Sequence, residues 1–343
     1  MTTAILTDAR FAAHTLSTHV ERAERLAAIE QALTTSGLAP DLLPLVATPA
    51  SEATLAAVHT PQLLSAIRRL SDYGGGAFDP DTYVTADSWE VMTLTAGGVI
   101  RLVQALVHGE CANGFALTRP PGHHATAERA MGFCLVNPIA VAARYALDQL
   151  GIERLAIVDY DVHHGNGTQD IFYDEKRVLF CSIHAAPFYP GSGMLSEIGK
   201  AAALGSTLNV PLPFGVGDAG YEQVLSQVLA PALRRWQPQL ILVSAGYDAH
   251  WSDPLGPMIV SVGGFFTMTK ILNELARELC GGKIALVLEG GYNLEALGAS
   301  VVASLRALMS LEPEPDLLGT YMRPEPEIDG ILAALRRSHP LLK

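Results

Sequence analysis

The sequence predicts an α/β protein built on an open parallel sheet with helices on both faces. Two observations carry this prediction. Short apolar runs rich in β-branched residues recur between Gly, Pro or charged residues, and they alternate with longer segments that have apolar residues every three or four positions. Such an alternation of strand and helix is typical of α/β proteins. Since no repeat, low-complexity tract or linker interrupts the pattern, we expect residues 1–343 to form a single domain.

The expected elements follow one another along the chain. Before the first clear strand, the pattern predicts a loop over 72–85 and helices over 22–33, 61–70 and 88–107. The predicted strands are 114–118, 155–158, 178–183, 240–244 and 284–288. Helices with a regular apolar face are expected over 137–150, 221–236, 264–279 and 294–311. In an open parallel sheet the ligand site forms at the carboxyl ends of the strands, so the residues just after each strand are the candidates for chemistry.

Composition restricts the class of function. The 343 residues are 49% hydrophobic, and the formal net charge is −12 at pH 7. A nucleic-acid partner is not expected, because phosphate contacts need clustered Lys and Arg and the chain has no basic run. The acidic field would suit a cationic substrate, although an acidic balance more often serves solubility.

Several features predict a reduced, cytoplasmic location. The four cysteines are scattered without a CxxC pair, and the N-terminus lacks a cationic region leading into a long apolar stretch. Apolar runs such as LAIV and LILV are too short to cross a bilayer, so no membrane partner is expected. The oligomeric state is left open, and a homo-oligomer is compatible with the sequence.

Polar residues with catalytic chemistry follow every predicted strand. In chain order these segments are RPPGHH at 119–124, DYDVHHG at 159–165, SIH at 182–184, AGYDAH at 245–250 and EGGYN at 289–293. In an extended segment Asp161 and His163 point the same way, so one carboxylate oxygen and one imidazole nitrogen can reach the same metal. Asp248 can supply a third ligand. An Asp, His, Asp set leaves positions open for water and substrate, as a catalytic zinc requires.

The motifs together resemble those of a known family. A single Asp-x-His is most often a cap or turn, but RPPGHHA, GFCLVN, DYDVHHGNG, SAGYDAHWSDPLG and LEGGYN resemble the ordered motifs of the histone deacetylase superfamily. That superfamily includes acetylpolyamine amidohydrolases and acetoin-utilisation proteins, and HHGNG and EGGYN are similar to its class II and bacterial branches. The resemblance implies the arginase/deacetylase fold and one Zn²⁺ per chain. It also implies hydrolysis of acyl-lysine in a protein or peptide, or alternatively of an acetylpolyamine or other small acylated amine.

The resemblance also implies a role for each residue near the metal. It makes the same Asp, His, Asp set the zinc ligands, with zinc or ferrous iron left open as the metal. His124 is then the general base and later the acid, and His123 is its electrostatic partner, held by Asp159. Tyr292 donates a hydrogen bond to the oxyanion. The alternative for Tyr292 is a packed core tyrosine.

Two further positions near the metal have both a functional and a structural interpretation. Class I relatives carry aspartate where Asn166 stands, and an amide there should leave His124 with a lower pKa; alternatively Asn166 is only a loop residue. Arg25 aligns with an arginine near the acetate-release channel of relatives, and its alternative is a solvated helix residue.

The resemblance extends to a substrate tunnel and a second ion. Phe133 and Tyr189 correspond to the aromatic walls of the acyl-lysine tunnel, with Gly132 beside them, although either aromatic could belong to the core. Leu255 stands at the rim, where the polyamine-selective branch carries glutamate, so the sequence favours acyl-lysine over acetylpolyamines. Ser182 matches a monovalent-cation site that holds K⁺ in relatives.

Two other classes of function compete with this interpretation. An arginase-like hydrolase shares the expected fold but holds two manganese ions, needs more bridging carboxylates and has no role for the paired histidines. An inactive acyl-lysine-binding module would predict a lost metal ligand or a missing Tyr292, and neither is lost.

Overall fold

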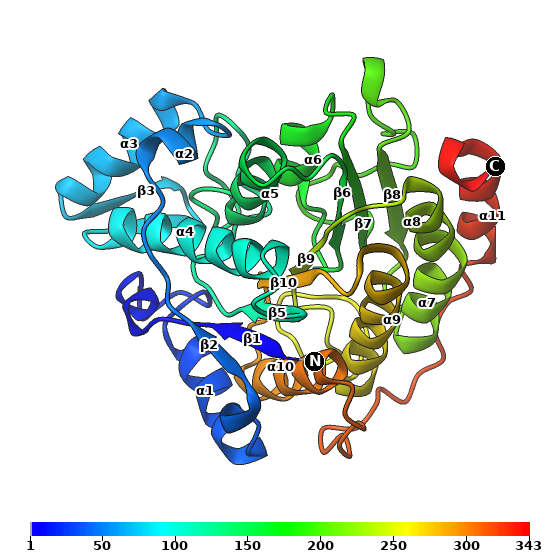
Figure 1. The fold of residues 1–343 in the computed structure, drawn as a ribbon. Coiled ribbons are helices and arrows are strands. Elements are labelled where there is room, and N and C mark those ends of the chain that lie inside the picture. Colours follow the sequence, from blue (N-terminus) through cyan, green and yellow to red (C-terminus); the bar gives the residue numbers. More distant parts are fainter. Residues whose placement is uncertain (1) are drawn as a thin grey trace.

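One parallel sheet of eight strands forms the centre of the molecule in a computed structural model that describes residues 2–343 (Figure 1). The strand order is β2-β1-β5-β10-β9-β6-β7-β8, and every neighbouring pair is parallel. The strands are β1 (Thr3–Leu6), β2 (Leu43–Leu45), β5 (Asn113–Ala116), β6 (Leu155–Asp159), β7 (Val178–Ala185), β8 (Thr207–Leu212), β9 (Ile241–Ala245) and β10 (Ile284–Leu288). The predicted α/β class and open parallel sheet are confirmed.

Helices cover both faces of this sheet (Figure 1). Successive side chains of β6 alternate between two hydrophobic clusters: Leu155 and Ile157 belong to one, and Ala156 and Val158 to the other. The first cluster includes residues of α2 (Glu52–Ala56), α3 (Pro61–Asp72), α4 (Ser88–Val107), α5 (Pro138–Gln149) and α6 (Asn166–Phe172). The second includes residues of α1 (Glu24–Ser36), α7 (Asp218–Val224), α8 (Ala230–Trp236), α9 (Val262–Cys280), α10 (Leu294–Met309) and α11 (Asp329–Ser338).

Several strands lie outside the predicted set. The stretch 72–85, expected to be a loop, contains an antiparallel hairpin of β3 (Gly75–Asp79) and β4 (Thr82–Thr85). The edge strands β2 and β8 carry Pro44 and Pro211, and a residue without an N–H is tolerated at an edge, where one side needs no partner. These strands escaped prediction because they are short or contain residues that usually interrupt strands.

The helix predicted over 221–236 is continuous but not regular. A π-helical turn over 225–229 separates α7 from α8. Pro231 lies in the first turn of α8 and has no N–H to continue the i→i−4 pattern. A single π-helical turn inside an α-helix can accommodate such a break.

Helix α4 is a longer apolar segment than the short runs considered as membrane spans from the sequence. Its 20 residues are apolar enough to cross a bilayer by length and composition alone. In the fold, 78% of its apolar window is buried, and its side chains belong to the hydrophobic cluster described above. Its apolar character is therefore accounted for by core packing.

The strand order determines where the candidate residues meet. Strand β9 lies between β10 and β6, and β5 lies on the other side of β10. Because all four strands are parallel, the segments that follow them emerge at the same edge of the sheet.

Candidate active site

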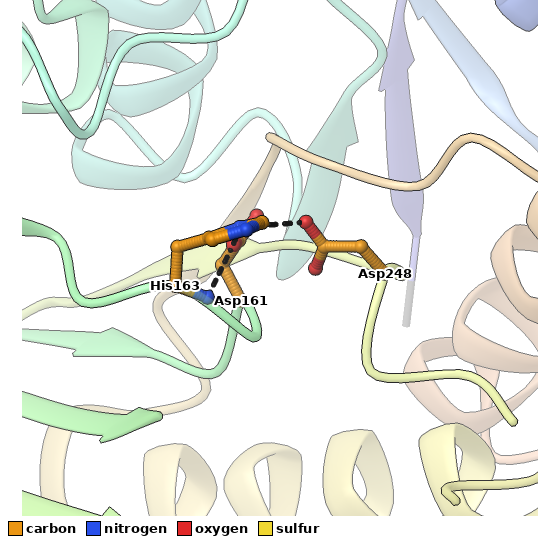
Figure 2. Close-up of side chains that lie close together, drawn as sticks. All are labelled: Asp161, His163 and Asp248. Atoms are coloured by element: carbon orange, nitrogen blue, oxygen red, sulfur yellow. Dashed lines mark hydrogen bonds and ion pairs between the residues drawn. The ribbon is translucent and has the colours of Figure 1, made fainter. Parts of the chain in front are cut away.

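Three predicted metal ligands converge at the carboxyl edge of the sheet. Asp161 and His163 lie in the segment after β6, and Asp248 lies in the segment after β9. Each side chain offers one donor atom, and the three donor atoms lie within 4.8 Å of one another. Figure 2 shows the edge of the His163 ring turned toward both carboxylates.

The contacts among these three side chains fit a bound cation. Nδ1 of His163 lies 3.1 Å from Oδ1 of Asp161 and 3.2 Å from Oδ2 of Asp248. One ring nitrogen cannot donate to both oxygens, and Oδ2 of Asp248 accepts no well-formed hydrogen bond from any described residue although it is buried. Two buried carboxylates and an imidazole facing one point form a donor set for a divalent metal.

Electrostatics at this point also favour a positive charge. Burial, followed by the negative charge of Asp161, raises the pKa of Asp248. Burial works against the charged form of His163, but the nearby carboxylates of Asp161 and Asp248 outweigh it and raise its pKa to about 9. The carboxylates therefore compete for a proton that a cation could replace.

Glycines allow the backbone to approach these carboxylates closely. A Cβ at Gly290 would lie 2.1 Å from Oδ2 of Asp248, and one at Gly246 would lie 2.1 Å from Oδ2 of Asp161. The N–H of Gly290 instead donates to Oδ2 of Asp161 at 2.9 Å, and the N–H of Val162 donates to Oδ1 of Asp248 at 3.0 Å. These bonds orient the ligands before any metal binds.

The paired histidines lie beside this cluster in contrasting surroundings. Nδ1 of His123 lies 3.0 Å from Oδ2 of Asp159, and its ring centroid is 4.0 Å from that of His124. Burial disfavours the charged form of His123, but the charges of Asp161 and Asp159 hold its pKa well above the ordinary value. Burial, and then the charges of His123 and His163, hold the pKa of His124 well below it. These shifts favour the charged form of His123 and the neutral form of His124.

Asn166 contacts His124 directly. Its Oδ1 lies 2.7 Å from Nδ1 of His124, and a carbonyl oxygen only accepts hydrogen bonds. The proton of the neutral ring therefore resides on Nδ1, and Nε2 is the basic nitrogen. Asn166 begins helix α6 and is more than a loop residue.

Arg25 is buried against the segment that carries Tyr292, so it is not a solvated helix residue. Its Nε donates to the carbonyl of Gly291 at 2.7 Å, and its guanidinium carbon lies 5.0 Å from the centre of the Tyr292 ring. Burial raises the pKa of Tyr292 well above its ordinary value, so the phenol stays protonated. Tyr292 keeps its hydrogen available to donate.

A pocket of about 240 Å³ leads down to these groups. Its lining includes the four predicted tunnel residues together with catalytic candidates: Gly132, Phe133, Tyr189, Leu255, His123, His124, His163 and Tyr292. The rings of Phe133 and Tyr292 meet edge to face at 5.7 Å, and those of Tyr189 and His124 do so at 5.1 Å. Gly132 has φ +56°, and a Cβ there would lie 2.5 Å from the His124 ring.

Two acidic residues at the same pocket were not singled out from the sequence. Asp79 and Asp81 lie at the turn of the β3–β4 hairpin and line the same pocket as Leu255. The DPD sequence at 79–81 was the available signal, but it fell within a stretch expected to be a loop. Phe188 was also missed; its ring stacks on that of His163 at 5.1 Å.

A buried carboxylate joins the N-terminal segment to this site. Glu21 lies 3.2 Å from Nη1 of Arg25 and 2.8 Å from Nη2 of Arg119, and all three side chains are fully buried. Burial works against the charge of Glu21, but Arg119 and then Arg25 hold its pKa at about 2. The carboxylate stays ionised between two guanidinium groups.

Ser182 lies on β7, paired in register with Asp159 of β6. It is fully buried, and its hydroxyl lies 2.9 Å from Nδ1 of His184. Its role at a monovalent cation stays a prediction.

Comparison with known proteins is consistent with this geometry. The histone deacetylase domain model matches residues 19–308. Histone deacetylase 10, chloroplastic, of Oryza sativa is 43% identical over 287 residues, covering 80% of this chain and 64% of the rice protein. A probable deacetylase of Archaeoglobus fulgidus is 39% identical over 298 residues, covering 86% of this chain and 82% of the archaeal protein.

A solved structure shares the whole fold. The HDA15 HD domain superposes with a TM-score of 0.90 at 37% identity, covering all of this chain and 98% of that domain. The expected arginase/deacetylase fold is therefore confirmed, and these findings support a hydrolytic deacetylase. The chain belongs to the histone deacetylase family.

Proposed function

We propose that this protein is a zinc-dependent deacetylase that hydrolyses the amide of acyl-lysine in a peptide or protein. One observation carries the proposal: the donor atoms of Asp161, His163 and Asp248 lie together, and this cluster, here called the floor, adjoins through His163 a pocket that His124 and Tyr292 also line. A metal site, a base and a hydrogen-bond donor around one point are what amide hydrolysis requires.

The residues fit one divalent cation. Two carboxylate oxygens and an imidazole nitrogen suit zinc, and ferrous iron accepts the same ligands. Such a cation supplies Lewis-acid polarisation of the amide carbonyl and lowers the pKa of a water molecule. Asp159 does not bridge to a second metal, because its Oδ1 accepts the N–H of Asp161 at 3.1 Å and its Oδ2 holds His123. An arginase-like pair of manganese ions is therefore not favoured.

Proton transfer falls to His124. Its basic Nε2 accepts the proton of the attacking water, and the resulting imidazolium returns a proton to the leaving amine. Burial and the charge of His123 keep His124 in the neutral form before the reaction, and the carbonyl oxygen of Asn166 holds the ring proton at Nδ1. Asp159 balances the charge of His123 from behind.

Stabilisation of the oxyanion falls to Tyr292. The carbonyl oxygen gains negative charge as water adds to the amide, and the protonated phenol donates a hydrogen bond to it. Arg25 holds the carbonyl of Gly291 next to this residue and covers the face of its ring. Arg25 supports the donor without lining the pocket itself.

Two observations bear on the substrate. Aromatic rings of Phe133 and Tyr189 flank a pocket that suits an aliphatic stem ending in a flat amide. The apolar side chain of Leu255 favours a peptide over a polyamine, whereas Asp79 and Asp81 would attract a second ammonium group. An acetylpolyamine is therefore the second candidate substrate.

The test uses metal-free protein prepared with a chelator and reconstituted separately with Zn²⁺, Fe²⁺ and Mn²⁺. Each form is assayed on acetyl-lysine peptides, N-acetylpolyamines and longer acyl groups, with bound metal counted in parallel. We expect one zinc per chain and release of free acid from the lysine peptide. We also expect faster turnover when K⁺ replaces a bulky organic cation in the buffer. Two manganese ions per chain, or tight binding of acyl-lysine without turnover, would reject the proposal.

A further inference from the structure

A buried aspartate connects the segment of Tyr292 to the rim of the pocket. Asp253 lies between β9 and α9 and is 7% exposed. Its Oδ2 accepts the backbone N–H groups of Tyr292 at 2.6 Å and Asn293 at 3.0 Å. Its Oδ1 accepts the backbone N–H of Leu255 at 2.9 Å. One carboxylate therefore ties together two segments about 40 residues apart in sequence, which carry the phenol and a rim residue.

The backbone before Tyr292 depends on such outside contacts. Gly290 and Gly291 precede it, and Gly291 has φ +119°, a conformation that glycine adopts readily and other residues do not. Two consecutive glycines give this segment conformational freedom that must be removed if the phenol is to occupy one position. Arg25 restrains it at the carbonyl of Gly291, and Asp253 restrains it at the two following amides.

The requirement at position 253 is for an acceptor with two free oxygens. An ionised carboxylate only accepts, and its two oxygens meet three N–H donors here. An asparagine of the same shape would turn its NH₂ group toward either the Tyr292 side or the Leu255 side. A donor facing donors cannot form these bonds, so one of the two segments would be released.

We infer that Asp253 is a positioning residue that holds the Tyr292 hydroxyl at its working position and Leu255 at the rim. The inference rests on the proposed function, since it concerns the oxyanion donor of that reaction. Displacement of a reacting group by about 1 Å can cost on the order of a hundredfold in rate. We expect Asp253→Asn to lower kcat by roughly ten- to a hundredfold, with KM changed much less and the metal retained.

A double-mutant cycle separates positioning from general destabilisation. Asp253→Asn is made in the parent and in Tyr292→Phe, and kcat on an acetyl-lysine peptide is measured for all four proteins. If Asp253 acts through the phenol, the substitution costs much less in the Tyr292→Phe background than in the parent. An equal fold-loss in both backgrounds would overturn the inference.

Asp316→Asn is the matched control. Asp316 also accepts three backbone N–H groups, from Val262 at 3.1 Å, Leu318 at 2.9 Å and Gly319 at 3.0 Å, but it does not line the pocket. This control should keep kcat within about twofold of the parent while losing a comparable set of hydrogen bonds. A loss of kcat as large as that of Asp253→Asn would mean that the effect is one of general stability.

A spectroscopic readout keeps the test independent of turnover. In protein labelled with ¹³Cζ-tyrosine, the Tyr292 resonance is identified as the one missing from Tyr292→Phe. We expect Asp253→Asn, and not Asp316→Asn, to shift or broaden that resonance. An unmoved resonance contradicts the inference even if no deacetylation is found, whereas an inactive parent with a displaced resonance contradicts only the proposed function.

Asn293→Ser covers the case in which Asp253→Asn does not fold. It removes the side-chain amide bonds from Asn293 to the Ser252 carbonyl at 3.1 Å and hydroxyl at 3.0 Å, and serine still caps α10. The substitution weakens the contact between the Tyr292 segment and the segment of Asp253 more mildly than Asp253→Asn does. The Tyr292 resonance should therefore broaden, and kcat should fall by a fewfold. Parental kcat together with a parental resonance would overturn the inference.

Discussion

The floor and the rim of the pocket are built in different ways. At the floor, Asp161 and Asp248 are fully buried, and each accepts a backbone N–H from a neighbouring segment. At the rim, Asp81 is exposed on a hairpin turn, Tyr189 is 43% exposed, and Leu255 is half-buried. The floor rests on the central strands of the sheet, whereas the rim is made of loops and a hairpin outside it.

This contrast indicates which substitutions should matter most. Charges at the floor interact in a poorly solvated space, where loss of one partner leaves another uncompensated. Charges at the rim are screened by water and salt. We therefore expect large effects on chemistry from the floor and modest effects on selectivity from the rim, and the four predictions below test that order.

The largest effect is expected from Asp248→Ala. Removal of one of three ligands should abolish both metal binding and hydrolysis, and Asp161→Ala or His163→Ala should do the same. Metal content per chain and turnover of an acetyl-lysine peptide are measured together. Asp218→Asn serves as the control. Oδ1 of Asp218 accepts the backbone N–H of Ser261 at 2.8 Å, and neither residue lines the pocket. Full activity of Asp248→Ala after exhaustive chelation would reject a metal mechanism.

The next effect is expected from Tyr292→Phe. Loss of an oxyanion donor typically costs about a hundredfold or more in kcat, on the order of 3 kcal/mol, and the phenyl ring should preserve packing against Phe133. Zinc content should remain at one per chain. Single-turnover and steady-state rates on the same peptide provide the measurement. A variant that matches the parent would leave Tyr292 with only its structural role.

A pH shift is expected from Asn166→Asp. A carboxylate beside Nδ1 stabilises the imidazolium, so it raises the pKa of His124. Because the base must be neutral, activity is lost as pH falls through this pKa, and the acidic limb of kcat/KM should move to higher pH by about one unit. Asn166→Ala adds no charge and should not move the limb upward. An acidic limb that stays in place in Asn166→Asp would exclude His124 as the titrating base.

The smallest effect is expected from Leu255→Glu at the rim. An added carboxylate should move the kcat/KM ratio toward N-acetylpolyamine over acetyl-lysine peptide by about 1 kcal/mol, roughly fivefold, the scale of one specificity contact. The shift should shrink as salt is added, and Leu255→Gln should not reproduce it. A change in this kcat/KM ratio as large as the loss of kcat in Tyr292→Phe would contradict the expectation that the rim has smaller effects than the floor.

The floor was largely predictable from the sequence. Asp161 and His163 stand two apart after one strand, so a single extended segment presents two ligands, and Asp248 follows another strand of the same sheet. The alternation of strands and helices specified the parallel sheet that brings those strand ends together. The pairing of Asn166 with His124 was expected from the family resemblance, with a simple loop residue as the alternative.

The rim and its supports were not predictable from local pattern. Asp81 lies at the turn of the β3–β4 hairpin, and the glycines and proline of this hairpin are typical of loops. Asp253 depends on contacts with amides about 40 residues further along the chain, which no local periodicity records. The edge strands β2 and β8 are hard to predict from sequence because each contains a proline. Proline is tolerated at a sheet edge but normally indicates that a segment is not a strand.

The buried Glu21 makes the beginning of the chain part of the reaction machinery. Its carboxylate holds Arg25, which supports the Tyr292 segment, and Arg119, which begins the segment of the paired histidines. A shortened chain that starts beyond Arg25 would retain every metal ligand, yet it would leave Arg119 as a buried cation without its counter-charge. For protein engineering, tags and fusions at the N-terminus therefore have to preserve this segment intact, whereas the exposed stretch over 311–315 offers a safer place for an insertion.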